Sequence, residues 1–156
     1  MGLDMYLTAK LHTVDRDWAS EKERKINKEV RKLIPEMFDS GNLNTIEVGF
    51  EVGYWRKANA IHQWFVDKCQ DGNDDCRSSF VSRTDLQDLK TACENELKTK
   101  DNPEESDEQI EPSAGFFFGT YEKDEWYYGA LEETIKIVTK CLELPEEWDF
   151  YYQSSW

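Results

Sequence analysis

The 156-residue sequence is poor in the side chains that most often perform catalysis or bind metals. Its only histidines are His12 and His62, and its four cysteines form no C-x-x-C pair. It also lacks the motifs G-x-S-x-G, H-E-x-x-H, G-x-x-x-x-G-K-[ST] and G-x-G-x-x-G, which mark common hydrolase, metal and nucleotide sites. We therefore expect no cofactor and no metal site, and we expect ligand binding in preference to catalysis.

Long hydrophobic runs are missing as well. No stretch approaches the roughly 18 uncharged apolar residues of a membrane span, and residues 1–4 lack the basic and apolar regions of an export signal. The sequence thus predicts a cytoplasmic protein with reduced cysteines. Three of these cysteines, Cys69, Cys93 and Cys141, fall on apolar helix faces and are expected in the core.

The charge is strongly negative and unevenly distributed. The net charge is −14, and residues 61–156 contain 9 Lys or Arg against 23 Asp or Glu, whereas residues 1–60 are balanced. Such a surface repels nucleic acid and anionic membranes, so neither is expected as a partner, and it favours basic protein partners. A solvated acidic surface without a partner is the simpler interpretation.

Hydrophobic periodicity predicts an α+β fold. Strands are expected at residues 3–11, 46–52, 78–81, 115–119 and 148–152, where apolar residues alternate or glycines bound a short apolar run. Helices are expected from Ser20, from Gly53, from Ser82 and over residues 123–144, because apolar residues recur there every three to four positions. We expect a single domain, residues 1–156, with a small, mainly antiparallel sheet of about four to five strands covered by about four helices. A flexible acidic loop is expected at residues 98–113, and a mixed sheet with parallel crossovers remains an alternative.

The segment 53–65 is the centre of this organisation. Interpreted as a helix, it places Tyr54, Ala58, Ile61 and Phe65 on an apolar face. Its adjoining polar edge then carries Trp55, Arg56, Asn59, His62 and Gln63.

This polar edge is the first candidate for a ligand site. Arg56 and Lys57 would lie in the first helical turn, where free N–H groups also attract an anion, and Gly53 would let a ligand approach the backbone. Trp55 offers a face for stacking, and Asn59 and His62 offer hydrogen-bonding groups. The alternatives are a core Trp55, an Arg56 that pairs with a carboxylate, and a buried, hydrogen-bonded His62.

A second candidate is the aromatic set at residues 116–118 and 126–128. These rings either pack in the core or remain open to a partner. If Trp126 or Tyr128 lies beside Trp55, the rings could form the walls of one pocket with it.

Several of these segments resemble a known group of proteins. Residues 1–7, 53–65, 74–76, 81–86, 115–119 and 124–128 are similar to marker segments of a family of small, mostly uncharacterised proteins from phages and prophage-bearing bacteria. The run from Gly53 to His62 is the most specific part, whereas the basic helix from Ser20 to Lys32 departs from the family pattern. The resemblance implies the cytoplasm of an infected or prophage-bearing bacterial cell, and it implies no reaction.

Three functions are consistent with the sequence. The first is a non-catalytic protein that sequesters a small phosphorylated or nucleotide-like molecule, such as an immune signal of the host. The second is an acidic inhibitor that docks on a basic or nucleic-acid-binding surface of a host protein. The third is a nucleotide hydrolase with His62 as its base. Homo-oligomers are compatible with all three, because the sequence is rich in aromatic clusters.

Overall fold

The computed structural model describes residues 2–38, 45–100, 110–111 and 122–156, and these form an α+β fold, as predicted. Their contacts divide the chain into two compact units. Unit 1 comprises residues 1–9 and 51–156, and unit 2 comprises Lys10–Phe50. The elements, in chain order, are β1 (Asp4–Val14), α1 (Glu21–Leu33), η1 (Pro35–Met37), β2 (Thr45–Arg56), α2 (Asn59–Cys69), β3 (Ser79–Val81), α3 (Arg83–Lys98), α4 (Glu125–Glu143) and β4 (Asp149–Ser155).

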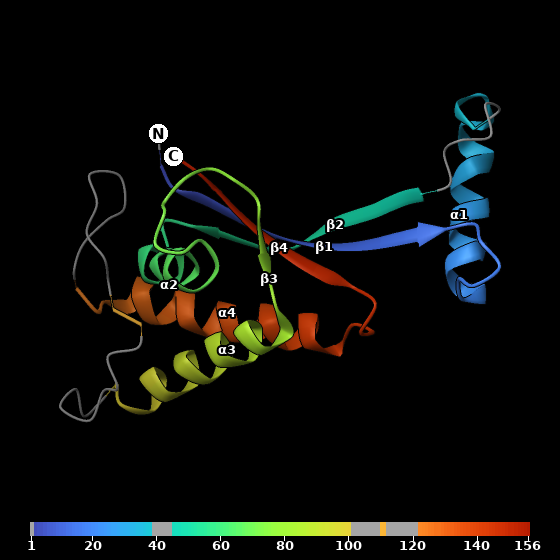
Figure 1. Cartoon of the computed structure of the whole chain (residues 1–156). Helices are drawn as coiled ribbons and strands as arrows, with labels where there is room; N and C mark the ends of the chain where they lie inside the picture. Colours follow the sequence, from blue (N-terminus) through green and yellow to red (C-terminus); the bar gives the residue numbers. More distant parts are fainter. Residues whose placement is uncertain (1, 39–44, 101–109, 112–121) are drawn as a thin grey trace. The chain divides into compact units, whose positions relative to one another are not determined.

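The described strands form one antiparallel sheet in the order β2-β1-β4-β3. Its short edge strand, β3, pairs with β4 so that Phe80 lies opposite Tyr151 and Val81 opposite Phe150. In unit 1, helices α2, α3 and α4 lie on one side of this sheet (Figure 1). One sheet face therefore packs on helices, and the alternation of buried with mostly half-buried residues along β1 follows from it.

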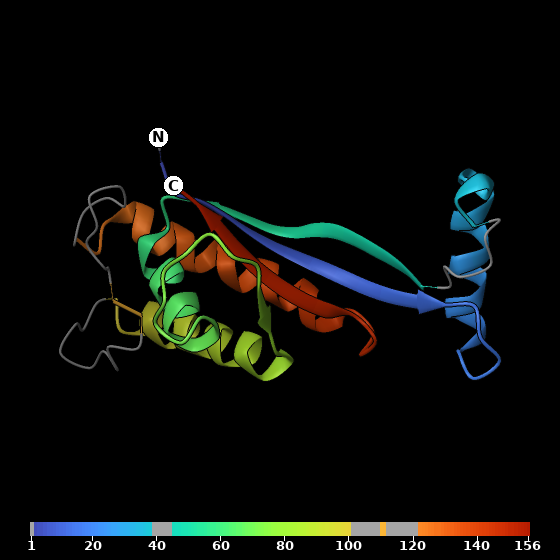
Figure 2. The same ribbon diagram turned by 45° about the horizontal axis from the view of Figure 1, so that its top comes forward.

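The core of unit 1 lies between the sheet and these helices. The strands contribute Met5, Leu7, Phe150 and Tyr152, and Leu3 directly precedes β1; all five are buried. α3 and α4 run side by side (Figure 2), and their buried residues at helical spacing include Leu86, Leu89, Leu131 and Val138. Cys93 and Cys141 are also buried, as predicted, and Cys69 is half-buried.

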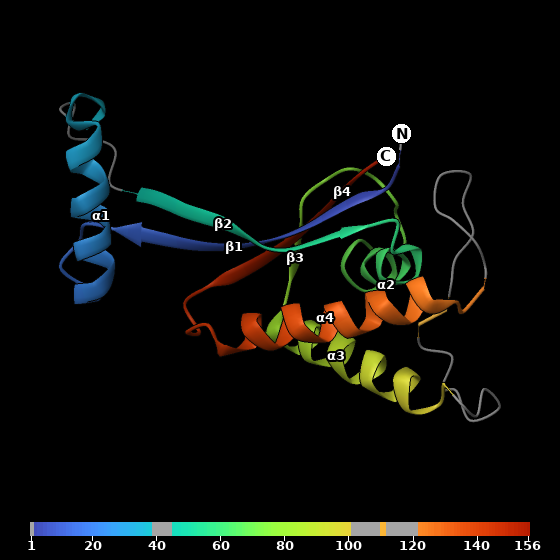
Figure 3. The same cartoon turned by 180° about the vertical axis from the view of Figure 1, so that it is seen from behind.

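Unit 2 consists of the remaining parts of β1 and β2 together with α1 and η1. α1 lies across the end of these strands (Figure 3). Ser20 accepts a hydrogen bond from the N–H of Glu23 and the Glu23 side chain caps in return, so the predicted capping box is present. The contact between helix and strands is polar, because Asn27 is buried and donates to the carbonyl of Thr13.

Two predictions concern residues outside the described part of the chain. The strand at 115–119 lies there entirely, as does most of the acidic loop at 98–113. The last residues of α3 and residues 110–111 are described, and Ile110 is buried in the core of unit 1.

Candidate binding pocket

The central helix begins later than predicted. Residues 53–56 belong to β2, Lys57 has a φ of 56°, and α2 begins at Asn59. The reason is that strand pairing continues to this point: the N–H of Lys57 donates to the carbonyl of Leu3. Arg56 and Lys57 therefore precede the helix and do not lie in its first turn, which corrects the sequence interpretation.

Because these residues form a strand, the sides predicted for Tyr54 and Trp55 are exchanged. In a strand, neighbouring side chains point to opposite sides, so Tyr54 is 48% exposed while Trp55 is 3% exposed. The indole N–H of Trp55 donates to Thr134 Oγ1 at 2.9 Å, and its ring packs against Phe65. Trp55 is thus a core residue, the alternative that the sequence left open.

Gly53 serves packing, contrary to the expectation that it lets a ligand approach. A Cβ atom at this position would lie 2.7 Å from Cγ2 of Ile137 and 3.0 Å from the Trp55 ring. The glycine therefore allows α4 to pack closely on β2.

His62 is buried inside unit 1. It is 2% exposed, its Nδ1 lies 2.7 Å from the Tyr152 hydroxyl, and its Nε2 lies 3.1 Å from an oxygen of Asp74. Both ring nitrogens thus face polar groups of the protein. His62 is not among the residues that line the pocket described next.

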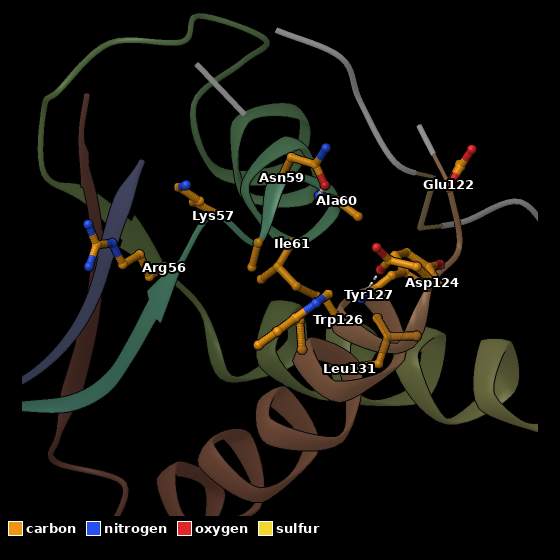
Figure 4. A pocket seen from close by; sticks show the side chains of 12 residues that line it. Arg56, Lys57, Asn59, Ala60, Ile61, Glu122, Asp124, Trp126, Tyr127 and Leu131 are labelled. Atoms are coloured by element: carbon orange, nitrogen blue, oxygen red, sulfur yellow. Dashed lines mark hydrogen bonds between the residues drawn. The ribbon is translucent and has the colours of Figure 1, made fainter. Parts of the chain in front are cut away.

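A pocket of about 680 Å³ lies where β2 ends and where α2 and α4 begin. Its floor is apolar and includes Ile61, Ala130 and Leu131. In Figure 4, Arg56 and Lys57 lie on one side, Asp124 and Glu122 on the other, and Trp126 between them. The remaining lining residues are Ala58, Asn59, Ala60 and Tyr127.

The cationic side of the pocket contains the N-terminus of α2. Ala58 is the N-cap of α2 and provides no side-chain hydrogen bond, although the Asn59 side chain accepts from the N–H of Ala60. Arg56 lies 3.9 Å from Asp4, whereas Lys57 has no ion pair within the described ranges. The positive helix end and Lys57 therefore act together at this side.

The acidic side is organised differently. Asp124 is the N-cap of α4 and accepts from the N–H of Tyr127 at 2.9 Å. Its carboxylate is thus held by the helix that it caps, while Glu122 is exposed. Carboxylate oxygens accept hydrogen bonds, so this side favours donor groups of a ligand.

The two aromatic candidates of α4 lie apart. Trp126 is 87% exposed and lines the pocket. Tyr128 is half-buried, contacts the Tyr127 ring and has the ammonium of Lys100 4.6 Å from its ring centroid, and it does not line the pocket. Of the predicted site residues, the structure thus brings together Arg56, Lys57, Asn59 and Trp126.

Sequence reasoning missed Asp124, Glu122 and the apolar floor. The signal for Asp124 was present, because an Asp just before an apolar helical repeat is a typical N-cap. The floor gave no such signal, since Ala130 and Leu131 are also ordinary core positions of α4.

A second groove, of about 510 Å³, adjoins the pocket along α4. It shares Arg56, Ala58, Trp126 and Ala130 with the pocket and adds Tyr54, Trp55, Glu125, Gly129 and Glu133.

Among the described residues, no helix is long and apolar enough to cross a membrane. Within the same ranges, no three His, Cys, Asp or Glu side chains are grouped as a metal site. Comparison with known proteins finds no matching family model, curated protein or solved structure, so the pocket is interpreted from its own geometry.

Proposed function

We propose that this protein binds, without converting it, a small anionic molecule that carries an aromatic ring, such as a nucleotide with one phosphate group. The observation that supports this most directly is the composition of the pocket. An exposed indole, Trp126, lies between Lys57, which has no ion pair with other described residues, and two carboxylates.

Each part of such a ligand has a matching group. A phosphate at Lys57 would receive a charge-assisted contact and would lie at the positive end of α2. A base would stack on Trp126, and sugar or base donors would face Asp124 and Glu122. The volume of about 680 Å³ is within the range of small-molecule sites.

The two carboxylates also favour a ligand that carries few negative charges. A triphosphate would bring several negative charges close to Asp124 and Glu122, whereas a monophosphate or cyclic phosphate can keep its single group at Lys57. We therefore expect monophosphates and cyclic nucleotides to bind more tightly than triphosphates.

Binding is proposed in preference to hydrolysis because of where His62 lies. The hydrolase hypothesis used His62 as the base, yet this residue is buried between Tyr152 and Asp74. The biological role proposed here, sequestration of a signalling nucleotide in an infected bacterial cell, rests on the resemblance to phage proteins.

The test is a thermal-shift screen with mono-, di-, tri- and cyclic nucleotides, with the matching nucleosides as uncharged controls. A ligand at a hundredfold excess over its Kd stabilises the fold by about 2.7 kcal/mol, which raises the Tm by a few degrees. Recovery of the intact ligand supports binding alone, and recovery of products would contradict the proposal.

Variants then locate the site. Lys57→Ala should weaken binding about 10- to 100-fold through loss of a charge-assisted contact. Lys68→Ala, which removes an equal charge from the exposed last turn of α2, should leave the affinity unchanged. If the two variants bind the ligand with equal affinity, the pocket is not the binding site.

Acidic docking on a basic host protein is a second candidate. Unit 2 has eight Lys or Arg and eight Asp or Glu, so the net charge of −14 falls entirely on unit 1. Pull-down from bacterial lysate at low and high salt tests this function, because an electrostatic complex weakens steeply with salt.

A further inference from the structure

The ligand pocket and the groove along α4 adjoin each other. Arg56, Ala58, Trp126 and Ala130 line both of them, and all their lining residues belong to unit 1. The pocket has a volume of about 680 Å³ and the groove has a volume of about 510 Å³, so each alone is within the range of small-molecule sites. A single nucleotide held in the pocket would therefore leave the groove empty.

Trp126 lies where the pocket and the groove meet. It is the second residue of α4, its side chain is 87% exposed, and it lines both spaces. An indole ring has two flat faces, and each face can stack on an aromatic base. Two bases, one on each face, would cover apolar surface that a single base leaves in water. This position therefore favours a ligand with two rings over a ligand with one.

Gly129 leaves the floor of the groove open. It lines the groove and not the pocket, and it lies inside α4, four residues after Glu125. Glycine destabilises a helix interior relative to alanine. Packing does not require glycine here, because a Cβ atom built at this position would meet no atom within 4 Å. The bare backbone instead gives a flat ring room to lie against the helix.

The groove repeats the chemistry of the pocket. The pocket joins the Trp126 indole to two carboxylates. The groove joins the same indole to the exposed ring of Tyr54 and to the carboxylates of Glu125 and Glu133. Glu133 lies 3.9 Å from Lys136, which is beyond hydrogen-bond length, so both carboxylates can accept the N–H donors of a base. Two spaces of similar chemistry are suited to the two bases of one molecule.

Arg56 supplies a positive charge between the two spaces. Its Nε lies 3.9 Å from an oxygen of Asp4, and this oxygen accepts a hydrogen bond from the Tyr54 hydroxyl at 2.5 Å. The guanidinium is exposed and makes no hydrogen bond to other described residues. Its fork of N–H groups matches the two non-bridging oxygens of a phosphodiester. Arg56 is thus placed to bind the phosphate that links two nucleosides.

We infer that the ligand is a dinucleotide, in which one or two phosphodiester bonds join two nucleosides. One base lies in the pocket, the other lies in the groove, and Trp126 separates them while Arg56 binds a linking phosphate. Each phosphodiester carries one negative charge, which agrees with the preference for few charges beside the carboxylates. Longer oligonucleotides would be repelled by the net charge of −14. This inference rests on the proposed function and specifies its ligand.

Calorimetry of the full-length protein with matched probes tests the inference. The probes are the linear dinucleotides ApA and GpG, cyclic di-AMP and cyclic di-GMP, with AMP and GMP as single-base references. A linear or a cyclic dinucleotide should bind about tenfold or more tightly than the mononucleotide with the same base, because a second stacked base adds to the affinity. If dinucleotides and mononucleotides bind equally, the inference is wrong and the proposed function stands. If none of the probes binds, both are wrong.

Gly129→Gln locates the second base. The new side chain fills the groove, so the preference for a dinucleotide over its mononucleotide should be lost. Glutamine favours a helix over glycine, so the Tm should not fall. Lys140→Gln is the control, because it places the same side chain about three turns further along α4 and outside both spaces. This control should keep the preference, and a Gly129→Gln variant that also keeps it would overturn the inference.

Discussion

The Nδ1 atom of His62 lies 2.7 Å from the hydroxyl oxygen of Tyr152, and both residues are buried. The other ring nitrogen, Nε2, lies 3.1 Å from an oxygen of Asp74, so both nitrogens of His62 have a polar neighbour. The pair therefore joins α2 to β4 inside the core, where we expect it to stabilise the fold.

Tyr152→Phe tests this role. The change keeps the ring stacked on Phe65, at a centroid distance of 4.0 Å, but leaves His62 Nδ1 without its partner. The free energy of unfolding should fall by about 1–3 kcal/mol, measured by urea denaturation, with ligand affinity unchanged. Tyr6→Phe is the control, because Tyr6 is half-buried and its hydroxyl makes no hydrogen bond to other described residues. Equal stability of the two variants would show that the buried hydrogen bond contributes nothing.

Gly53→Ala should destabilise the fold through a clash. The new methyl group would lie 2.7 Å from Cγ2 of Ile137, so α4 must shift from β2 at a cost of about 1–3 kcal/mol. Ile137→Ala removes that Cγ2 atom, so the double variant should lose less stability than the sum of the single variants. Gly129→Ala, which meets no atom within 4 Å, should instead stabilise α4 by about 0.5–1 kcal/mol. An additive double variant would exclude the clash.

The regular elements were predictable where one local signal dominated. The alternation along β1 and the capping boxes at Ser20 and Ser82 gave the correct strand and helix starts. The start of α2 was not predictable, because residues 53–58 fit both periods, and the pairing of Lys57 with Leu3 is a long-range contact.

Only part of the candidate site was predictable from the sequence. The sequence placed Arg56, Lys57 and Asn59 close to one another and left the position of Trp126 open, and the structure brings all four to one pocket. Trp55 and His62 were misplaced because their partners, Thr134 and Tyr152, are distant in the sequence. Local periodicity contains no information about such partners.

The cysteines should differ strongly in reactivity. Burial raises the pKa of Cys69, Cys93 and Cys141 to about 12 in each case, and Cys76 is exposed. A raised pKa keeps a thiol protonated, so at pH 8 only about one in ten thousand of these groups is the reactive thiolate. A thiol reagent should therefore label one cysteine rapidly in the native protein and all four in urea.

Cys76→Ser provides the control for this experiment. It should abolish the rapid labelling phase, and three cysteines should then be labelled in urea. A second rapid thiol in the native wild type would contradict the burial of Cys69, Cys93 or Cys141. Raising the pH towards 10 should speed the slow phase, because more of the buried thiols then ionise.

Asp124 allows charge and capping to be separated in the ligand pocket. Asn is as good an N-cap as Asp, so Asp124→Asn should keep the hydrogen bond to the N–H of Tyr127 and leave the stability nearly unchanged. It also removes a negative charge from the pocket, so a nucleotide with several phosphates should bind several-fold more tightly, measured by calorimetry. Asp124→Ala removes the same charge and the cap together, and it should lower the free energy of unfolding by about 1 kcal/mol. If neither variant changes the affinity for di- or triphosphates, Asp124 does not face the bound ligand, and the orientation proposed for the ligand is wrong.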